Sequence, residues 1–247
     1  MTHQLFLGEA AAVAAAIVGT SVHLDGDEGR HAGTVVRLRV GERYYVADGA
    51  GRRLLVEAES VEKATVVGRV LEAVDEPAPD PRLVLVQALA KGDRDDQAVE
   101  AATELGVDEI VAWQAERSVV VWRADRVARS LAKWAAVVTR AVKQSRRARM
   151  PLVSGPVDTQ ALSGRVRTAA LTLVLHEDAS EPLAQVELPA AGDVLVVVGP
   201  EGGISEREIG LLVQAGARPV RLGPTILRAS SAGPAALAVL SAGSRWR

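Results

Sequence analysis

Three prolines at alternate positions occur in residues 76–81, which read Glu-Pro-Ala-Pro-Asp-Pro. Each proline restricts its own φ and disfavours the helical region for the residue before it, so this segment is an extended connector. It predicts a linker between one domain over residues 1–75 and another over residues 82–247. The chain has 247 residues, 48% of them hydrophobic, which is enough for two domains with buried cores.

The part before the prolines contains short β-like runs separated by turn signals. Within each run, apolar or β-branched residues recur, and glycine-containing pairs lie between the runs. Short strands joined by tight turns are typical of a small β-barrel, which we predict for this domain. The predicted strands are residues 34–40, 43–47, 53–57 and 65–73.

The part after the prolines alternates strand-like runs with helical patterns, which is typical of a mainly parallel α/β sheet. One predicted helix covers residues 93–105. Asp93 and Asp96 lie near its positive N-terminal end, and Gly106 is its stop signal. The predicted strands are residues 83–88, 110–113, 171–175, 194–198 and 219–222.

Two loops near the C-terminus each follow one of these apolar runs. The first, residues 199–203, reads Gly-Pro-Glu-Gly-Gly, in which glycine permits positive φ and the close approach of a ligand. Ser205 and Glu208 then form a capping-box pattern that predicts the start of a helix. The second loop, residues 222–228, reads Leu-Gly-Pro-Thr-Ile-Leu-Arg. Either loop alone could be an ordinary strand-to-helix connection, but the pair predicts a cofactor site built from backbone.

Several common kinds of site have no signature in this sequence. The first strand-to-helix turn of the α/β part, residues 91–94, reads Lys-Gly-Asp-Arg rather than G-x-G-x-x-G, and the P-loop and G-x-S-x-G patterns are absent. There is no cysteine, and the four histidines are scattered, so we expect no metal site. No apolar stretch is long enough for a membrane span and no signal peptide is evident, so we expect no membrane association and a cytoplasmic location.

Basic residues are concentrated in one segment, although the net charge of the chain is only −2. Residues 117–149 carry ten basic side chains against the single acidic Asp125. On a helix, six of them share one face and five apolar residues share the opposite face. This pattern favours a nucleic-acid contact over a merely solvated face, which usually mixes both signs. The basic face comprises Arg126, Arg129, Lys133, Arg140, Lys143 and Arg147, and the apolar face comprises Val127, Leu131, Trp134, Val138 and Val142.

Six short blocks occur in a fixed order along the chain. They are Lys91-Gly92-Asp93-Arg94, Thr103-Glu104-Leu105-Gly106-Val107, Glu116-Arg117-Ser118, Gln144-Ser145-x-Arg147, Gly199-Pro200-Glu201-Gly202-Gly203 and Leu222-Gly223-x-x-Ile226-Leu227-Arg228. Together these blocks resemble RsmE-type ribosomal RNA methyltransferases of the SPOUT superfamily. In the first part of the chain, His31-x-x-x-Val35-Val36-Arg37 followed by Gly41-Glu42 is similar to the PUA-like RNA-binding barrel of that family.

The resemblance implies a SPOUT-type parallel α/β sheet with a C-terminal trefoil knot, preceded by a PUA-like β-barrel. It also implies S-adenosylmethionine as methyl donor, N3 of a specific uridine in 16S ribosomal RNA as acceptor, the assembled small ribosomal subunit as RNA partner, and a homodimer. In the knot, adenine would lie against the last loop and methionine near residues 199–203. The residues expected to bind the cofactor are Leu175, His176, Glu177, Gly199, Pro200, Glu201, Gly202, Gly203, Leu222, Gly223, Ile226 and Leu227.

With this reaction in mind, the charges and positions of particular residues predict a catalytic cation and a set of RNA contacts. Arg228 is expected to favour the uracil anion by its charge, and an ion pair with Glu201 at a helix N-terminus is the structural alternative. For His31 and Arg37 the alternative is that both are satisfied polar groups on barrel strands. The residues expected to contact RNA are His31, Arg37, Lys91, Arg94, Arg129, Lys133, Arg140, Lys143 and Arg147.

One position departs from the family pattern. The family commonly has a glutamate two residues after the arginine of the last block, whereas this chain has Ser230, so a glutamate base is excluded there. Ser230 and Ser231 could instead cap a helix that runs to Leu240, with Pro234 in its first turn. The substitution leaves open an alternative function, an RNA-binding module whose SPOUT domain no longer transfers methyl groups.

Overall fold

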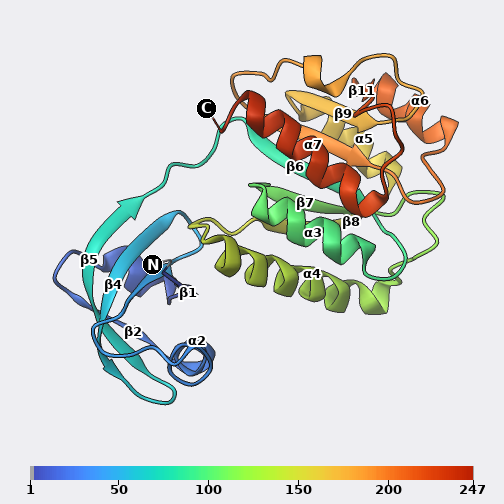
Figure 1. Cartoon of the computed structure of the whole chain (residues 1–247). Coiled ribbons are helices and arrows are strands. Elements are labelled where there is room, and N and C mark those ends of the chain that lie inside the picture. The colour runs from blue at the N-terminus through green and yellow to red at the C-terminus, as the bar shows by residue number, and fades with distance from the viewer. Residues whose placement is uncertain (1–2, 247) are drawn as a thin grey trace. The chain divides into compact units, whose positions relative to one another are not determined.

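The computed structural model describes residues 3–246, and the chain divides into two compact units (Figure 1). The first unit extends to Ala78 and includes Thr139–Met150. The second comprises Pro79–Val138 and the chain from Pro151 onward. The first division falls inside the proline segment. The assignment of Thr139–Met150 to the first unit has no signal in the sequence, because one helix continues across this division without a break.

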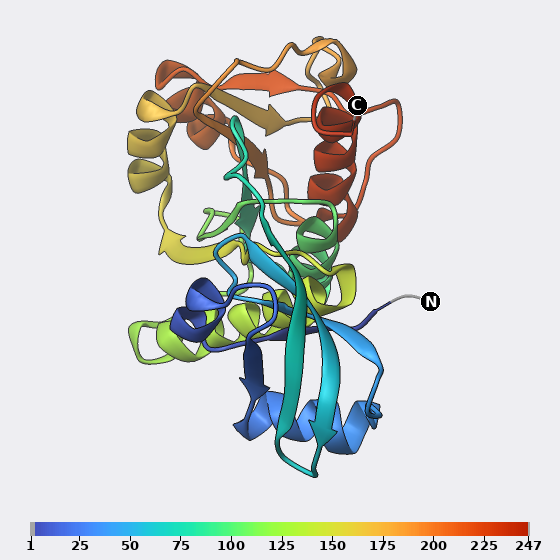
Figure 2. The ribbon, with the colours of Figure 1, turned by 90° about the vertical axis from the view of Figure 1, so that its left-hand side faces the viewer.

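The first unit consists of a five-stranded sheet and short helices (Figure 2). Its elements are β1 (Leu5–Leu7), α1 (Ala10–Ala15), β2 (Ser21–Leu24), α2 (Gly26–Arg30), a π-helix (His31–Val36), β3 (Arg43–Ala47), β4 (Arg52–Val61) and β5 (Val66–Asp75). The strand order is β1-β3-β4-β5-β2, in which β1 is parallel to β3 and the other neighbours are antiparallel. Apolar side chains form one core, with Phe6, Tyr44 and Leu54 fully buried.

Residues 34–40, predicted to form a strand, do not form one. The chain continues from α2 into the π-helix, which ends at Arg37 in a left-handed conformation with φ of 61°. Val36 and Leu38 of this segment do pack against the core, but they reach it from the π-helix and the turn after it, whereas Val35 and Val40 are exposed. The edge of the sheet beside β5 is occupied by β2, not by residues 34–40. His31 and Arg37 therefore lie on a helical turn, and their interpretation as polar groups on strands is wrong.

The second unit is a parallel sheet of six strands with helices on both faces (Figure 1). Its elements are β6 (Arg82–Ala88), α3 (Arg94–Glu104), β7 (Glu109–Trp113), α4 (Ala124–Ser145, whose last part belongs to the first unit), β8 (Leu152–Val157), α5 (Thr159–Thr168), β9 (Leu171–Leu175), a 3-10 helix (Leu183–Gln185), β10 (Asp193–Val198), α6 (Glu206–Gln214), β11 (Arg218–Val220) and α7 (Ala229–Gly243). The strand order is β11-β9-β10-β6-β7-β8, and every neighbouring pair is parallel. The predicted parallel α/β sheet is confirmed.

The strands of this sheet are buried on both faces, as their continuous apolar runs require. α5 and α6 cover one face, where Leu162 and Leu212 share a core with Val86 of β6. α7 covers the other face and also contacts α3. There, Gly233 allows α7 to approach Leu85, because a Cβ at this glycine would lie 2.8 Å from Leu85 Cδ1. Both faces are therefore closed, and a ligand can reach the sheet only at the ends of its strands.

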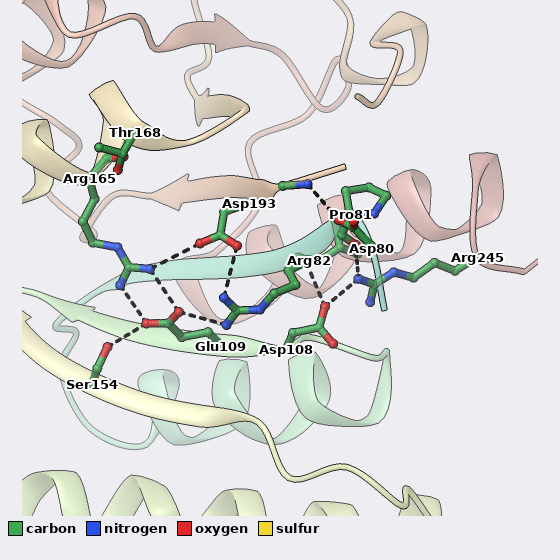
Figure 3. Close-up of polar contacts among 12 residues, drawn as sticks. Asp80, Pro81, Arg82, Asp108, Glu109, Ser154, Arg165, Thr168, Asp193 and Arg245 are labelled. Atoms are coloured by element: carbon green, nitrogen blue, oxygen red, sulfur yellow. Dashed lines mark hydrogen bonds and ion pairs between the residues drawn. The ribbon is translucent and has the colours of Figure 1, made fainter. Parts of the chain in front are cut away.

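Paired charges join the amino-terminal ends of these strands (Figure 3). Arg82, at the start of β6, donates to Glu109 of β7 at 3.3 Å and to Asp193 of β10 at 3.2 Å. Arg165 of α5 makes two bonds to Glu109, at 2.7 and 3.0 Å. Burial alone would raise the pKa of Glu109, but the hydrogen bonds and charge of Arg165, with smaller contributions from Ser154 and Arg82, hold that pKa below its ordinary value. The amino-terminal edge is thus occupied by structural ion pairs.

Candidate active site

Three loops at the carboxyl-terminal edge of the parallel sheet line a cavity of about 890 Å³. They follow β9, β10 and β11 and include residues 175–178, 198–204 and 221–229. Ligands of open parallel sheets usually bind at this edge. The residues predicted to bind a cofactor all line this cavity, namely Leu175, His176, Glu177, Gly199, Pro200, Glu201, Gly202, Gly203, Leu222, Gly223, Ile226 and Leu227.

The glycine loop, residues 199–203, contains glycine for two different reasons. Gly203 has φ of 72°, a conformation that strongly favours glycine. Gly199 and Gly202 do not have positive φ but are closely packed. A Cβ on Gly199 would lie 2.6 Å from Ile204 Cγ1, and one on Gly202 would lie 3.2 Å from Arg117 Cβ. Only one of the three glycines therefore uses the conformational freedom that the sequence pattern offers.

The helix after the glycine loop begins as predicted, with a capping box. The Ser205 hydroxyl accepts from the Glu208 N–H, and the Glu208 carboxylate accepts from the Ser205 N–H. Glu208 is fully buried and accepts two more hydrogen bonds, from the Thr159 hydroxyl at 2.7 Å and from the Glu116 N–H at 2.9 Å. The end of the glycine loop is thus fixed both to α5 and to the loop after β7.

Glu201, in the middle of the glycine loop, is held by the segment before α3. Its Oε1 accepts from Arg94 Nη1 at 2.8 Å and from the Lys91 N–H at 3.1 Å. Burial raises the pKa of this carboxyl, but backbone N–H groups and the Arg94 guanidinium together hold the pKa below its ordinary value. Arg94 lines the cavity with its charge already paired, whereas Lys91 is not part of the lining.

Arg228 lies directly before α7 and is its N-cap residue. Its carbonyl accepts from the N–H groups of Ser231 and Ala232. The predicted capping by Ser230 or Ser231 is therefore wrong, and Pro234 lies in the second turn of the helix, not the first. The helix begins earlier than predicted because the extended Arg228 backbone already provides the cap.

The arginines that line the cavity are of two kinds. Arg94 is paired with Glu201. Arg117, Arg221 and Arg228 are exposed and make no ion pair with any residue in the range 3–246. The predicted alternative for Arg228, an ion pair with Glu201, is therefore wrong. Arg117 and Arg221 were not predicted as site residues. Arg117 lies in one of the six family blocks, which could have drawn attention to it, but Arg221 has no sequence signal.

His176 begins the loop after β9 and lines the cavity. Its Nδ1 accepts from the Asp178 N–H at 3.3 Å, which leaves the proton of a neutral ring on Nε2. Glu177 and Asp178 follow it along the lining. Across residues 3–246 no group of three or more histidine, aspartate or glutamate side chains could hold a metal ion. The cavity is therefore lined by backbone, apolar groups, the Arg94–Glu201 ion pair and single charged side chains.

The long helix α4 is amphipathic as predicted. Trp134, Val138 and Val142 are almost completely buried. On the other side Arg129 and Arg140 are exposed and, within the described part of the chain, form no ion pair. These two arginines on the exposed side of α4 therefore have no carboxylate partner within the described chain. The structure, as far as it is described, contains no helix whose length and apolar character would suit a membrane span.

Two lysines of the same basic face do have partners within the chain. Lys133 Nζ lies 2.5 Å from Asp96 Oδ2, and this hydrogen bond raises the pKa of the lysine. In the first unit, Lys143 Nζ lies 2.7 Å from Glu28 Oε1 and 3.2 Å from His31 Nδ1. The side chain of Lys143 is only 19% exposed. These charges are therefore less available to an external ligand than Arg129 and Arg140.

The other predicted RNA-binding residues of the first unit differ in exposure. Arg37 is exposed, on the turn after the π-helix. Arg147 follows α4, is half-buried, and donates its N–H to the Val142 carbonyl. His31 packs edge-on against Phe6, with ring centroids 5.6 Å apart. Arg37 is thus the most accessible of the three.

The sequence and fold match known RNA methyltransferases. The RNA methyltransferase domain family matches residues 76–241. A Mycobacterium tuberculosis protein named ribosomal RNA small subunit methyltransferase E is 45% identical over 233 residues, covering 92% of this chain and 89% of the relative. A Bacillus subtilis protein of the same name is 29% identical over 226 residues, covering 88% of both chains.

A solved structure with the same arrangement extends this comparison. It is a ribosomal RNA small subunit methyltransferase E from Neisseria gonorrhoeae bound to S-adenosyl methionine, with 27% identity and a TM-score of 0.84 over 98% of both chains. The family match lies almost entirely within the unit that contains the cavity. The chain therefore belongs to the RNA methyltransferase family, among the ribosomal RNA small subunit methyltransferases E.

Proposed function

We propose that this protein transfers a methyl group from S-adenosylmethionine to N3 of a specific uridine in the 16S RNA of the small ribosomal subunit. The observation that carries this proposal is the cavity, because two of the family blocks, residues 199–203 and 222–228, meet there beside the loop after β9. Two further observations support it. The curated relatives are named for the small subunit RNA, and the Neisseria protein binds S-adenosyl methionine.

The cavity suits this cofactor in size and chemistry. Its volume of about 890 Å³ lies within the usual range of small-molecule sites. Ile226 is 79% exposed and Leu227 is 39% exposed, so an adenine ring could cover both. A Cβ on Gly223 would meet no atom within 4 Å, so the space beside this glycine is open to a ligand. The glycine loop would then receive the methionine part.

When bound, S-adenosylmethionine supplies a methyl group on a positively charged sulfur. N3 lies on the Watson–Crick edge of uracil, so the target base must be unpaired to enter the cavity. Arg228 would stabilise the negative charge that develops on the base as its N3 proton leaves. With Ser230 in place of a carboxylate, water or a weakly basic neighbour takes that proton. Transfer would break the sulfur–methyl bond and form the N3–methyl bond, which leaves a neutral thioether, and the loops of the cavity would position N3 for this step.

RNA affinity in this proposal comes mainly from the exposed basic residues of α4. Arg129 and Arg140 contribute most, because neither has a carboxylate partner within residues 3–246. Lys133 and Lys143 contribute less, because each already binds a carboxylate of this chain. The remaining predicted RNA-binding residues orient the RNA, namely His31, Arg37, Lys91, Arg94 and Arg147.

Finer features of the architecture belong to the same proposal and are supported by the family resemblance. They are a trefoil knot near the C-terminus of the methyltransferase domain, residues 82–247, and a PUA-like barrel over residues 1–75, joined by the linker 76–81. The active protein would be a homodimer that acts on the assembled small subunit in the cytoplasm.

Mapping of methylated nucleotides tests the proposed activity. Small subunits from a strain that lacks this protein should contain one uridine without the N3 methyl group. Adding the protein with S-adenosylmethionine should restore that methyl group. If every 16S uridine were modified equally with and without the protein, the proposed activity would be wrong.

Calorimetry with S-adenosylmethionine tests the alternative of an RNA-binding module without methyl transfer. Such a module would bind small subunits but would have no need for the cofactor. We expect the protein to bind the cofactor, because all the residues predicted to contact S-adenosylmethionine line the cavity.

A further inference from the structure

Arg117 is an exposed cation beside the glycine loop. It lines the cavity, and its Nη1 donates to the Gly202 carbonyl at 3.2 Å. Its Cβ also lies 3.2 Å from the position that a Cβ on Gly202 would occupy, so the two segments are in direct contact. Within residues 3–246 it pairs with no carboxylate. Most of its N–H groups therefore remain available to a ligand.

The loop that carries Arg117 is held firmly by its own hydrogen bonds. The preceding residue, Glu116, donates its N–H to the buried carboxylate of Glu208. The side chain of Gln114 binds two backbone groups farther along the loop, at 3.0 and 3.3 Å. A long side chain that starts from a fixed backbone loses less conformational freedom when it binds. This support is typical of a residue that positions a ligand.

The chemistry of the cavity points to an anionic group of the RNA as the ligand of Arg117. A uridine that enters the cavity leaves its stack, and its flanking phosphates then lie at the mouth. S-adenosylmethionine has a single carboxylate, whereas three lining arginines, Arg117, Arg221 and Arg228, have no carboxylate partner within residues 3–246. A guanidinium can hold a phosphate through two parallel N–H bonds.

We propose that Arg117 binds a backbone phosphate next to the target uridine while it keeps its hydrogen bond to the Gly202 carbonyl. One side chain thereby sets the position of the RNA relative to the glycine loop. This inference rests on the proposed function, because it takes the glycine loop as part of the cofactor site. Arg117 is then a substrate-positioning residue that contacts the RNA directly.

The test compares Arg117→Gln and Arg117→Lys with the control Arg167→Gln. Arg167 is an exposed arginine of α5 that forms no ion pair within residues 3–246 and does not line the cavity. For each protein, affinity for small subunits is measured against salt concentration, together with kcat, KM for the subunits, and cofactor affinity by calorimetry. Circular dichroism establishes that each variant is folded.

Arg117→Gln should weaken subunit binding about tenfold and lower the slope of log affinity against log salt by about one, because one phosphate contact is lost. Cofactor affinity should stay unchanged. Arg117→Lys should restore the slope but only part of the KM, because an ammonium group cannot bind phosphate in a fork and also donate to Gly202. Arg167→Gln should leave all four quantities unchanged.

Two results would overturn the inference. A loss of cofactor affinity in Arg117→Gln would assign the residue to the carboxylate of S-adenosylmethionine. A lower kcat with unchanged KM and salt slope would assign it to the uracil. If the wild-type protein methylated no RNA, the proposed function itself would fail, and the salt slopes would still decide whether Arg117 contacts RNA.

Discussion

The two edges of the parallel sheet differ in how most of their arginines are paired. At the amino-terminal edge, Arg82 and Arg165 are bound to carboxylates of this chain (Figure 3). At the carboxyl-terminal edge, Arg94 is paired with Glu201, but Arg117, Arg221 and Arg228 line the cavity without a carboxylate partner in residues 3–246. A paired arginine stabilises the fold, whereas an unpaired one beside a cavity is available to an anionic ligand. This contrast favours the carboxyl-terminal edge as the ligand-binding edge without reference to any relative.

The largest effect is expected at the carboxyl-terminal edge, from Arg228→Ala. If Arg228 stabilises charge on the uracil, kcat should fall by roughly 100-fold to 1,000-fold, the usual result of removing one donor to a developing anion. Cofactor affinity should change little, because the charge develops only during transfer. Initial rates and calorimetry measure the two quantities. An equal loss in both would place Arg228 among the cofactor-binding residues.

A substitution at the amino-terminal edge should instead reduce stability. Arg165→Leu leaves the buried Glu109 with one cationic partner, and we expect the free energy of unfolding in urea to fall by about 2–3 kcal/mol. Arg167→Leu, two residues along the same helix and exposed, should change it by less than about 0.5 kcal/mol. Both variants should keep normal kcat when folded. A normally stable Arg165→Leu protein without activity would contradict the division between the two edges.

The same distinction between paired and unpaired cations can be tested along α4. Removing two unpaired charges, with Arg129→Gln and Arg140→Gln, should lower the salt slope of RNA binding by about two. Removing Lys133 and Lys143 in the same way should lower it by less, because Asp96 and Glu28 already neutralise these charges. Glutamine keeps the helix propensity in both double variants. Equal slopes for the two would show that internal pairing does not govern RNA binding.

The smallest effect is the dependence of stability on pH at Glu109. Its pKa in the folded protein is below the ordinary value of 4.5, so ionised Glu109 stabilises the fold fully above that pH. This contribution is lost as the pH falls from about 4.5 through the lowered pKa. The difference in unfolding free energy between wild type and Glu109→Gln should therefore shrink from about pH 7 to about pH 3. A constant difference would mean that the Arg165 pair does not depend on the charge of Glu109.

The second unit was easier to predict from sequence than the first, because its signals are local. Buried strands such as residues 171–175 are continuous apolar runs, and Ser205 forms the capping box that its neighbours predict. β8 is an exception, because its Gly155-Pro156 pair is typical of a turn. In the first unit, the alternation of residues 34–40 looked like a strand. Which segment pairs with β5 depends on packing across the sheet, and β2 occupies that place.

Prediction of the candidate site from sequence is limited in the same way, because contacts between distant segments leave no local signal. Residues 199–203 and 222–228 carry recognisable patterns, so their meeting at one cavity could be expected from the family blocks. The pairing of Arg94 with Glu201 could not be expected from sequence, because these residues are 107 positions apart. Whether an arginine is free or paired depends on contacts between distant segments, and for Arg117 and Arg221 only the three-dimensional structure provides that information.

Helix α4 has a consequence for the modularity of this protein. The chain passes from one unit to the other after Ala78, after Val138 and after Met150, so the proline segment is only one of three crossings. A shortened protein that begins at Pro79 would keep the end of α4 without the unit to which it belongs. The contacts that join this segment to the rest of the first unit would be lost, among them the hydrogen bond from the Gly51 N–H to the Ala148 carbonyl at 3.2 Å and the Lys143–Glu28 ion pair. A single exchange of sequence at the prolines would therefore separate residues 139–150 from the unit with which they fold.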